Sequence, residues 1–129
     1  MLDTNTISVA TSGRSIAALH RIAGHIPEAL AASAISYGEI WFGLTRRPEA
    51  TALAHATRKL FEKVLVLPFT TAGADRYAQL RTDMQRLGTS LQPLDMLIAA
   101  HALEAGATLV SSDRAFRHVP GLTVEDWTQ

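Results

Sequence analysis

The hydrophobic positions of this 129-residue chain form short continuous runs that alternate with longer stretches of helical spacing. Short apolar runs bounded by turn residues are typical of buried strands. They predict strands at Ala31–Ile35, Val64–Leu67 and Thr108–Val110, with weaker ones at Met1–Leu2 and Leu122–Val124. Apolar residues three or four apart predict helices at Arg14–His25, Tyr37–Arg46, Ala50–Lys63, Ala72–Leu87 and Leu94–Ala105. This alternation favours an α/β fold with a mostly parallel sheet.

Length and composition fit one domain spanning residues 1–129, without a linker or a repeat. Twelve basic and twelve acidic side chains cancel, whereas nucleic-acid-binding domains are usually basic, so any polyanion site must be local. The absence of cysteine excludes disulfide and thiolate chemistry and fits a reducing cytosol. No apolar run approaches the roughly 18 residues of a membrane span, and no leader sequence is visible. We therefore expect a cytoplasmic protein with no membrane partner.

Four carboxylates fall where predicted strands end or predicted helices begin. Asp3 ends the first strand, and Asp113 follows the fourth strand in SSDRAF. We place Glu39 in the first turn of the helix after the second strand, and Asp95 at the start of the helix that leads into the fourth strand. Helices in a parallel α/β sheet begin at the edge where strands end, and such folds bind ligands there. The sequence therefore predicts that these four side chains meet at the carboxyl edge.

Each acid also has a purely structural interpretation. Asp3 and Asp113 could cap the turns that follow them, and Asp95 suits a helix dipole. Ser36 and Glu39 have the spacing of a capping box. However, acids set among apolar residues, such as Asp95 ahead of MLIAAHAL, lose hydration and repel one another unless a cation joins them. Oxygen ligands without cysteine favour Mg²⁺ or Mn²⁺ over Zn²⁺.

Four stretches carry a resemblance to a known family: LDTN at 2–5, SAISYGEIWFG at 33–43, PLDMLIAAHALEAGATLVSSD at 93–113 and FRHVPGLTVEDW at 116–127. In these stretches the chain resembles the PIN-domain ribonucleases, and among them the VapC toxins of type II toxin–antitoxin pairs. The PLD and VEDW features are most similar to the tRNA(fMet)-specific endonuclease subgroup, which acts on initiator tRNA. The resemblance covers nearly the whole chain and implies a three-layer α/β/α fold whose mostly parallel sheet has the strand order 3-2-1-4-5.

The resemblance also assigns site residues. Asp3, Glu39 and Asp95 match the three acids of the family, and Asp113 matches a fourth position that is Asp or Asn in relatives. Supporting positions are Asn5, which matches the Asn of D-x-N, and Ser111, which matches the Thr or Ser that steadies the first acid. The implied activity is Mg²⁺-dependent hydrolysis of RNA, with Mn²⁺ able to substitute. Relatives carry a few apolar residues before the first acid, whereas only Met1 and Leu2 stand there here, so either the first strand is short or the native start lies upstream.

RNA binding would need local positive charge. Arg46 and Arg47 end the helix that carries Glu39, and Arg114 and Arg117 follow Asp113, so both pairs are candidate phosphate contacts, although either could be an ordinary solvated face. The resemblance further implies a VapB-like antitoxin partner and a homodimer. An apolar patch on the Glu39 helix would serve as the interface if it is incompletely buried; it consists of Tyr37, Trp41, Phe42 and Leu44. The five histidines lack metal-ligand spacing. His101, in the apolar stretch after Asp95, is expected to be a core or near-site histidine.

Two rival interpretations stay open. A catalytically silent module on the same fold would bind RNA or protein without cleaving it, although all four acid positions are filled. A phosphohydrolase or receiver-type α/β domain is the other. A haloacid-type phosphohydrolase requires D-x-D at the first strand, where this chain has Asn5, and a receiver requires a lysine near its site, where only Lys59 and Lys63 exist, both on one predicted helix.

Overall fold

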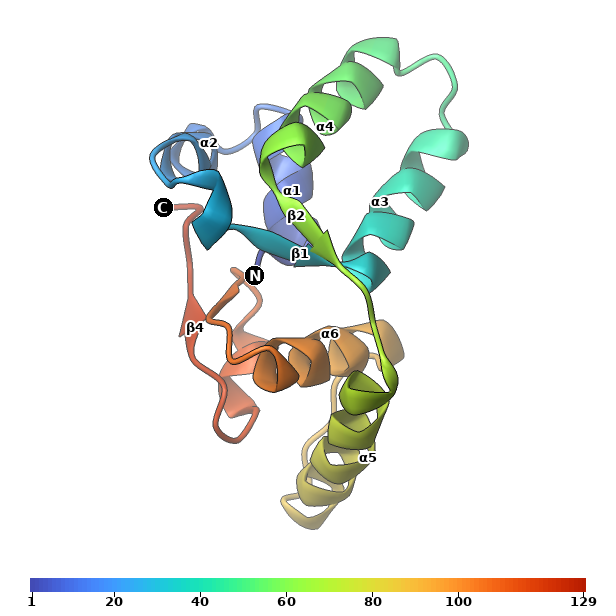
Figure 1. Ribbon diagram of the computed structural model, residues 1–129, viewed down its shortest axis with the longest axis vertical. Coiled ribbons are helices and arrows are strands. Elements are labelled where there is room, and N and C mark those ends of the chain that lie inside the picture. The colour runs from blue at the N-terminus through green and yellow to red at the C-terminus, as the bar shows by residue number, and fades with distance from the viewer.

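The computed structural model describes residues 1–129, and its helices and strands alternate as the hydrophobic pattern predicts (Figure 1). The helices are α1 (Thr4–Thr11), α2 (Ile16–Ala23), α3 (Ala34–Thr45), α4 (Thr51–Lys63), α5 (Thr71–Arg86) and α6 (Pro93–Glu104). The strands are β1 (Ala31–Ser33), β2 (Leu65–Leu67), β3 (Leu109–Val110) and β4 (Val124–Glu125). Two 3₁₀ helices, η1 (Pro27–Ala29) and η2 (Arg114–His118), complete the order.

The N-terminal segment joins two parallel ladders into one sheet. β1 pairs with β2, and β3 pairs with β4. Leu2 lies between them and forms parallel bridges to Ala32 of β1 and to Val110 of β3. Counted with this segment as the first strand, the sheet has the order 3-2-1-4-5. The strand order implied by the family resemblance is therefore confirmed, with a first strand reduced to a single bridging residue.

Helices cover both faces of the sheet, and Met1 and Leu2 point to opposite faces and pack against different helices. Successive strand residues point to opposite faces. Met1 belongs to the apolar cluster that contains buried residues of α5 and α6, whereas Leu2 belongs to the cluster that contains those of α1 and α2. Figure 1 shows α5 and α6 below β1 and β2, with α1, α2 and α4 above them. The architecture is thus the three-layer α/β/α arrangement that was expected.

The largest departure from the predicted elements is α1, a helix that the hydrophobic pattern did not predict. Its sequence, TNTISVAT, is rich in threonine and serine, which have modest helix propensity. The Asp3 side chain caps its first turn, and Ile7 and Ala10 are buried in the core. Capping and burial together outweigh the weak local propensity.

The start of α3 also differs from the prediction. We expected a strand at Ala31–Ile35, and the structural interpretation of Glu39 was a capping box with Ser36. The strand instead ends at Ser33, whose hydroxyl caps α3 by accepting the Ile35 N–H at 3.1 Å. The capping box is therefore wrong. Glu39 lies in the second turn of α3 rather than in the first, and its carboxylate is bonded to α1 instead of capping its own helix.

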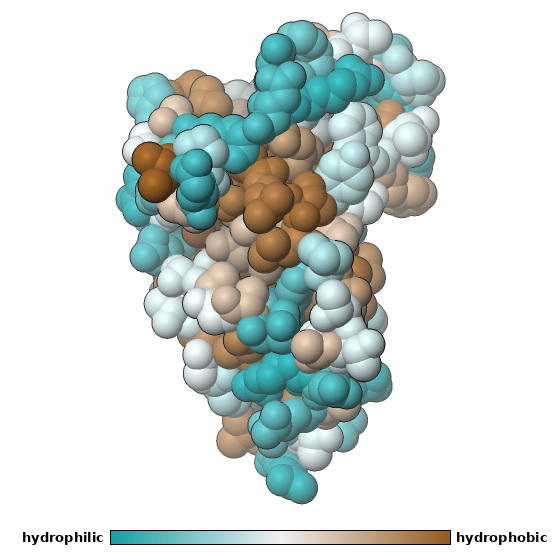
Figure 2. Space-filling model, viewed as in Figure 1, coloured by the Kyte–Doolittle hydropathy of each residue, from teal (hydrophilic) through white to brown (hydrophobic).

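The outer side of β2 is a free edge of the sheet. Apolar side chains gather over it in Figure 2, and Leu65 there is 62% exposed. None of the helices combines the length and the hydrophobicity that crossing a membrane would need.

Candidate active site

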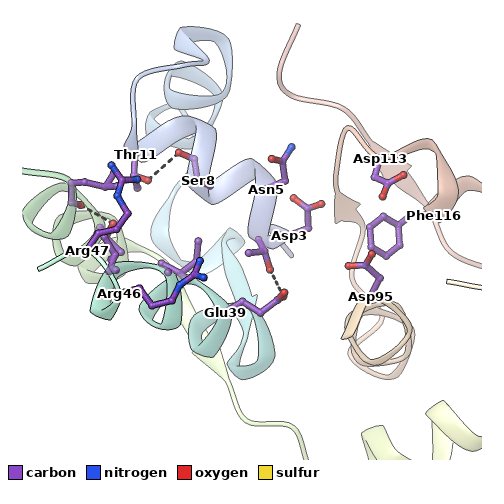
Figure 3. Close-up of a pocket in the computed structure, with 16 residues that line it drawn as sticks. Asp3, Asn5, Ser8, Thr11, Glu39, Arg46, Arg47, Asp95, Asp113 and Phe116 are labelled. Atoms are coloured by element: carbon purple, nitrogen blue, oxygen red, sulfur yellow. Dashed lines mark hydrogen bonds between the residues drawn. The ribbon is translucent and has the colours of Figure 1, made fainter. Parts of the chain in front are cut away.

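A cleft of about 520 Å³ opens beside the carboxyl end of the sheet, and all four predicted acids line it. Asp3, Glu39, Asp95 and Asp113 come from four segments that are far apart in the sequence (Figure 3). The rest of the lining comes mainly from the exposed face of α1 and from α3 and α4: Thr4, Asn5, Ser8, Thr11, Ile40, Gly43, Leu44, Arg46, Arg47, Leu53, Thr57 and Phe116. The topological prediction that the acids share one edge therefore matches the structure.

Asp3 is the most deeply buried of the four acids, with 4% of its surface exposed. Its backbone N–H donates to the Val110 carbonyl at 3.0 Å, which fixes it at the sheet edge. Its carboxylate accepts the Thr6 N–H at 2.7 Å and so caps α1. Burial raises the pKa of Asp3, while hydrogen bonds from Ser111 and Thr6 oppose that rise. The Ser111 hydroxyl also accepts the Asp113 N–H at 3.0 Å, so this residue lies between two of the acids.

Glu39 is held from the side by α1. The Thr4 hydroxyl donates to a carboxylate oxygen of Glu39 at 2.7 Å, across 35 residues of sequence. This bond joins the second turn of α3 to the residue directly after Asp3, and Figure 3 shows the Glu39 side chain reaching toward Asp3. Thr4 therefore orients one acid beside another, a role that the sequence analysis did not assign to it.

Asp95 and Asp113 complete the acidic end of the cleft. Asp95 lies in the first turn of α6, which begins at Pro93. Its pKa is raised by burial first, and then by the negative charges of Glu39, Asp113 and Asp3. Asp113 caps η2 by accepting the Ala115 N–H at 2.9 Å, as its structural interpretation suggested. It nevertheless faces the cleft, so capping and a place in the site are compatible for this residue.

The supporting residues and the arginines divide between the cleft and its surroundings. The Asn5 amide donates to the Ser112 hydroxyl at 3.2 Å and so ties α1 to the segment after β3. Arg46 and Arg47 line the other end of the cleft, and Figure 3 places them on the far side of Glu39 from Asp95 and Asp113. Arg114 and Arg117 are exposed and do not line it.

Three hydroxyl residues of the cleft wall were missed because α1 was not predicted. Thr4, Ser8 and Thr11 follow the spacing i, i+4, i+7 that places side chains on one face of a helix. A polar stripe of this spacing directly after Asp3 is the signal that could have revealed them. Ile7 and Ala10, which are buried, define the opposite face of the same helix.

The four acids fit a hard divalent cation in charge and in donor type. All their ligand atoms are oxygens, and after burial the negative charges of Glu39, Asp113 and Asp3 also raise the pKa of Asp95. In the observed arrangement, no group of three such side chains stands close enough to hold a metal ion. Binding would therefore draw the carboxylates together.

Comparisons with known proteins agree with this geometry. The PIN domain family model matches residues 1–122. The chain is 27% identical over 128 residues to the tRNA(fMet)-specific endonuclease VapC of Salmonella typhimurium, a match that covers 98% of this chain and 96% of that one. It is also similar to the structure of DNA-bound VapBC from Salmonella typhimurium, with a TM-score of 0.90, 27% identity and coverage of 98% and 96% of the two chains. The structure of VapBC-1 from nontypeable Haemophilus influenzae gives a TM-score of 0.85 at 27% identity, with 100% and 98% covered. This chain belongs to the PIN-domain family.

Proposed function

We propose that this protein is a metal-dependent endoribonuclease, the VapC-type toxin of a VapBC toxin–antitoxin pair. The observation that carries the proposal is the convergence of four carboxylates from distant segments on one cleft whose other end bears two arginines. Relatives that carry the names ribonuclease and endonuclease VapC support an RNA-cleaving hydrolase. Mg²⁺ is the proposed cofactor, and Mn²⁺ would substitute for it.

Asp3 and Asp95 would hold the principal metal ion, and Glu39 and Asp113 would complete the site directly or through water. A bound divalent ion lowers the pKa of water and offsets the charge that builds up on a phosphodiester during attack. The chain itself supplies the positioning: Thr4 orients Glu39, and Ser111 together with the Thr6 N–H orients Asp3. In the hydrolysis, the water oxygen bonds to phosphorus, the bond to the 3′ oxygen breaks, and that oxygen takes up a proton, leaving a 5′-phosphate and a 3′-hydroxyl.

The proposed substrate is tRNA, and initiator tRNA in particular. The support is the printed specificity of the Salmonella typhimurium relative, together with the PLD and VEDW features. Arg46 and Arg47 would contact phosphates next to the cleaved linkage, because they line the same cleft as the acids. Arg114 and Arg117, which lie outside the cleft, would contact more distant phosphates.

The proposed partners are a VapB-like antitoxin and a second copy of the chain. Support for the antitoxin comes from structural neighbours that are VapBC complexes. The apolar patch expected on α3 is only partly buried: Leu44 is buried, whereas Tyr37 and Phe42 are exposed. An incompletely covered face of this kind suits a protein interface.

The direct test is to incubate the purified chain with total tRNA and Mg²⁺, with and without EDTA, and to map the ends of the products. We expect cleavage that requires the metal and disappears in the Asp3→Asn variant. Mn²⁺ titration by calorimetry provides an independent readout. Metal binding without cleavage of any RNA would favour the silent module, and neither binding nor cleavage would overturn the proposal.

A further inference from the structure

A buried hydrogen bond joins the two helices that carry Glu39 and Asp95. The Nδ1 atom of His101, on α6, lies 2.7 Å from the hydroxyl oxygen of Ser33, which caps α3. His101 is 2% exposed and Ser33 is fully buried. Because 68 residues separate the partners, this bond fixes tertiary structure rather than local structure.

The bond and the acids occupy matching positions on the two helices. Glu39 lies six residues after Ser33, and His101 lies six residues after Asp95. At about 1.5 Å per residue, each acid is roughly 9 Å along its helix from the bonded pair. Because the bonded pair ties the start of α3 to α6, it helps to fix where the helix that carries Glu39 lies relative to the helix that carries Asp95. The charge of Glu39 contributes, after burial, to raising the pKa of Asp95.

The apolar packing of α6 is directed mainly at another helix. Its buried residues, among them Met96 and Ile98, belong to the cluster that contains Leu80 and Met84 of α5. The bond between Ser33 and His101 is the side-chain hydrogen bond that ties α6 to the start of α3. It therefore supplies a directional constraint between the two segments that carry the acids.

The surroundings of His101 keep its ring fixed and neutral. The ring meets Phe69 edge to face, with centroids 5.4 Å apart. Burial lowers the pKa of His101, and only the charge of Glu104 opposes this. The Ser33 oxygen accepts the Ile35 N–H, so its own hydrogen is free to be donated to Nδ1.

We propose that Ser33 and His101 form a positioning pair that sets the separation of Glu39 from Asp95 in the carboxylate site. This inference rests on the proposed nuclease function and deepens it. Neither residue lines the cleft, and both act through the helices that carry the acids. Substitution of residues that orient metal ligands without binding the metal typically lowers metal affinity or activity by about 10- to 100-fold.

The test compares His101→Leu with His101→Asn. Leucine fills the space but cannot bond Ser33, whereas the asparagine amide reaches the position of Nδ1. Isothermal calorimetry of Mn²⁺ binding and steady-state RNA cleavage are measured for both variants. We expect His101→Leu to weaken Mn²⁺ binding and lower kcat by about 10- to 100-fold, with KM for RNA nearly unchanged. His101→Asn should restore both to within a few-fold of the wild type.

Ser33→Ala provides a second route that keeps the histidine, and Ser15→Ala is its matched control. Both serines are buried caps, Ser33 on α3 and Ser15 on α2, where its hydroxyl accepts the Ala18 N–H at 3.1 Å. Both variants should lose thermal stability, but only Ser33→Ala should lose Mn²⁺ affinity.

The outcomes separate the two proposals. If the wild type cleaves RNA and binds Mn²⁺ but His101→Leu equals it, or His101→Asn is as impaired as His101→Leu, the positioning role is wrong and the nuclease assignment stands. Equal loss of Mn²⁺ affinity in Ser33→Ala and Ser15→Ala would also overturn the positioning role. A wild type that neither binds Mn²⁺ nor cleaves RNA would remove both.

Discussion

The two ends of the cleft are built in different ways. At the acidic end, Asp3 is buried and capped, and Glu39 is bonded by Thr4. At the basic end, the Arg47 side chain is 63% exposed, with only a 4.0 Å contact to Glu49, and Arg46 lies over the Phe42 ring at 4.7 Å. The Asp3 and Glu39 carboxylates are held in place by the fold, while the basic end consists of long side chains on the surface. This contrast suits an acidic end that performs chemistry and a basic end that recognises a flexible polyanion.

The largest effect is expected when the charge of Asp3 is removed while its hydrogen bond to the first turn of α1 is kept. Asp3→Asn should lower kcat by at least about 100-fold, because a ligand of the proposed metal loses its charge. Asparagine still caps α1, whereas alanine would also cost about 0.5–2 kcal/mol of stability. Single-turnover cleavage and circular dichroism measure the two effects. Cleavage at the wild-type rate would exclude Asp3 from the reaction.

Removing charge at the basic end should alter binding rather than chemistry. Arg46→Ala combined with Arg47→Ala should raise KM by about tenfold and reduce the slope of log affinity against log salt by about one to two. Arg86→Ala, on the exposed surface of α5, is the control with equal loss of charge per site. A double variant that lowers kcat and leaves the salt slope unchanged would show that the arginines do not bind phosphate.

A smaller effect is expected when the contact between Thr4 and Glu39 is deleted, because this contact supports the acidic end alone. Thr4→Val keeps the shape of the side chain but deletes the 2.7 Å bond to Glu39. Loss of one such bond to a charged group costs about 1.5–3 kcal/mol, so we expect kcat to fall by roughly tenfold or more. Thr82→Val, whose hydroxyl bonds only to Ala78 in its own helix, should leave kcat unchanged. Equal kcat in both variants would show that Glu39 needs no support from α1.

The smallest predicted effect is on stability. Removing the Asp95 carboxylate should stabilise the chain, whereas the substitutions above should impair activity. The pKa of Asp95 is raised above the ordinary value of 3.8, so the folded chain binds more protons than the unfolded chain between 3.8 and the raised value. Its stability without metal should therefore fall as pH rises through that interval. Asp95→Asn should abolish this loss and raise Tm at pH 7 by roughly 2–6 °C, measured by calorimetry in EDTA.

The Asp95 prediction has a built-in control. Saturating Mn²⁺ should raise the Tm of the wild type but not that of Asp95→Asn, because only the wild type gains stability from ligand binding. A Tm without metal that is lower in Asp95→Asn than in the wild type would contradict the repulsion between carboxylates.

The parts of the site that the sequence predicted are those governed by strand and helix order. The alternation of apolar runs and helical stretches placed Asp3, Glu39, Asp95 and Asp113 at one edge without knowledge of their contacts. In a parallel α/β sheet, residues at strand ends and helix starts lie at one edge, so a correct assignment of the elements is enough to place the acids there.

The parts that it did not predict depend on competition between neighbouring caps and on tertiary burial. Ser33 and Ser36 are both plausible caps, and only the pairing of Ser33 with strand β2 decides between them. The helix after Asp3, α1, has weak intrinsic helix propensity and is stabilised by burial of its apolar face. That burial cannot be seen in the local sequence pattern. The Thr4 contact was missed with it.

The Leu2 bridge has a consequence for the order in which the site assembles. The residue that β3 contributes to this junction lies more than 100 positions after Leu2, so the two halves of the sheet stay unconnected until β3 has been synthesised. Before that point Asp3 cannot bond the Val110 carbonyl, and the four acids cannot share one cleft. Assembly of the site is thus tied to the joining of the two halves of the sheet.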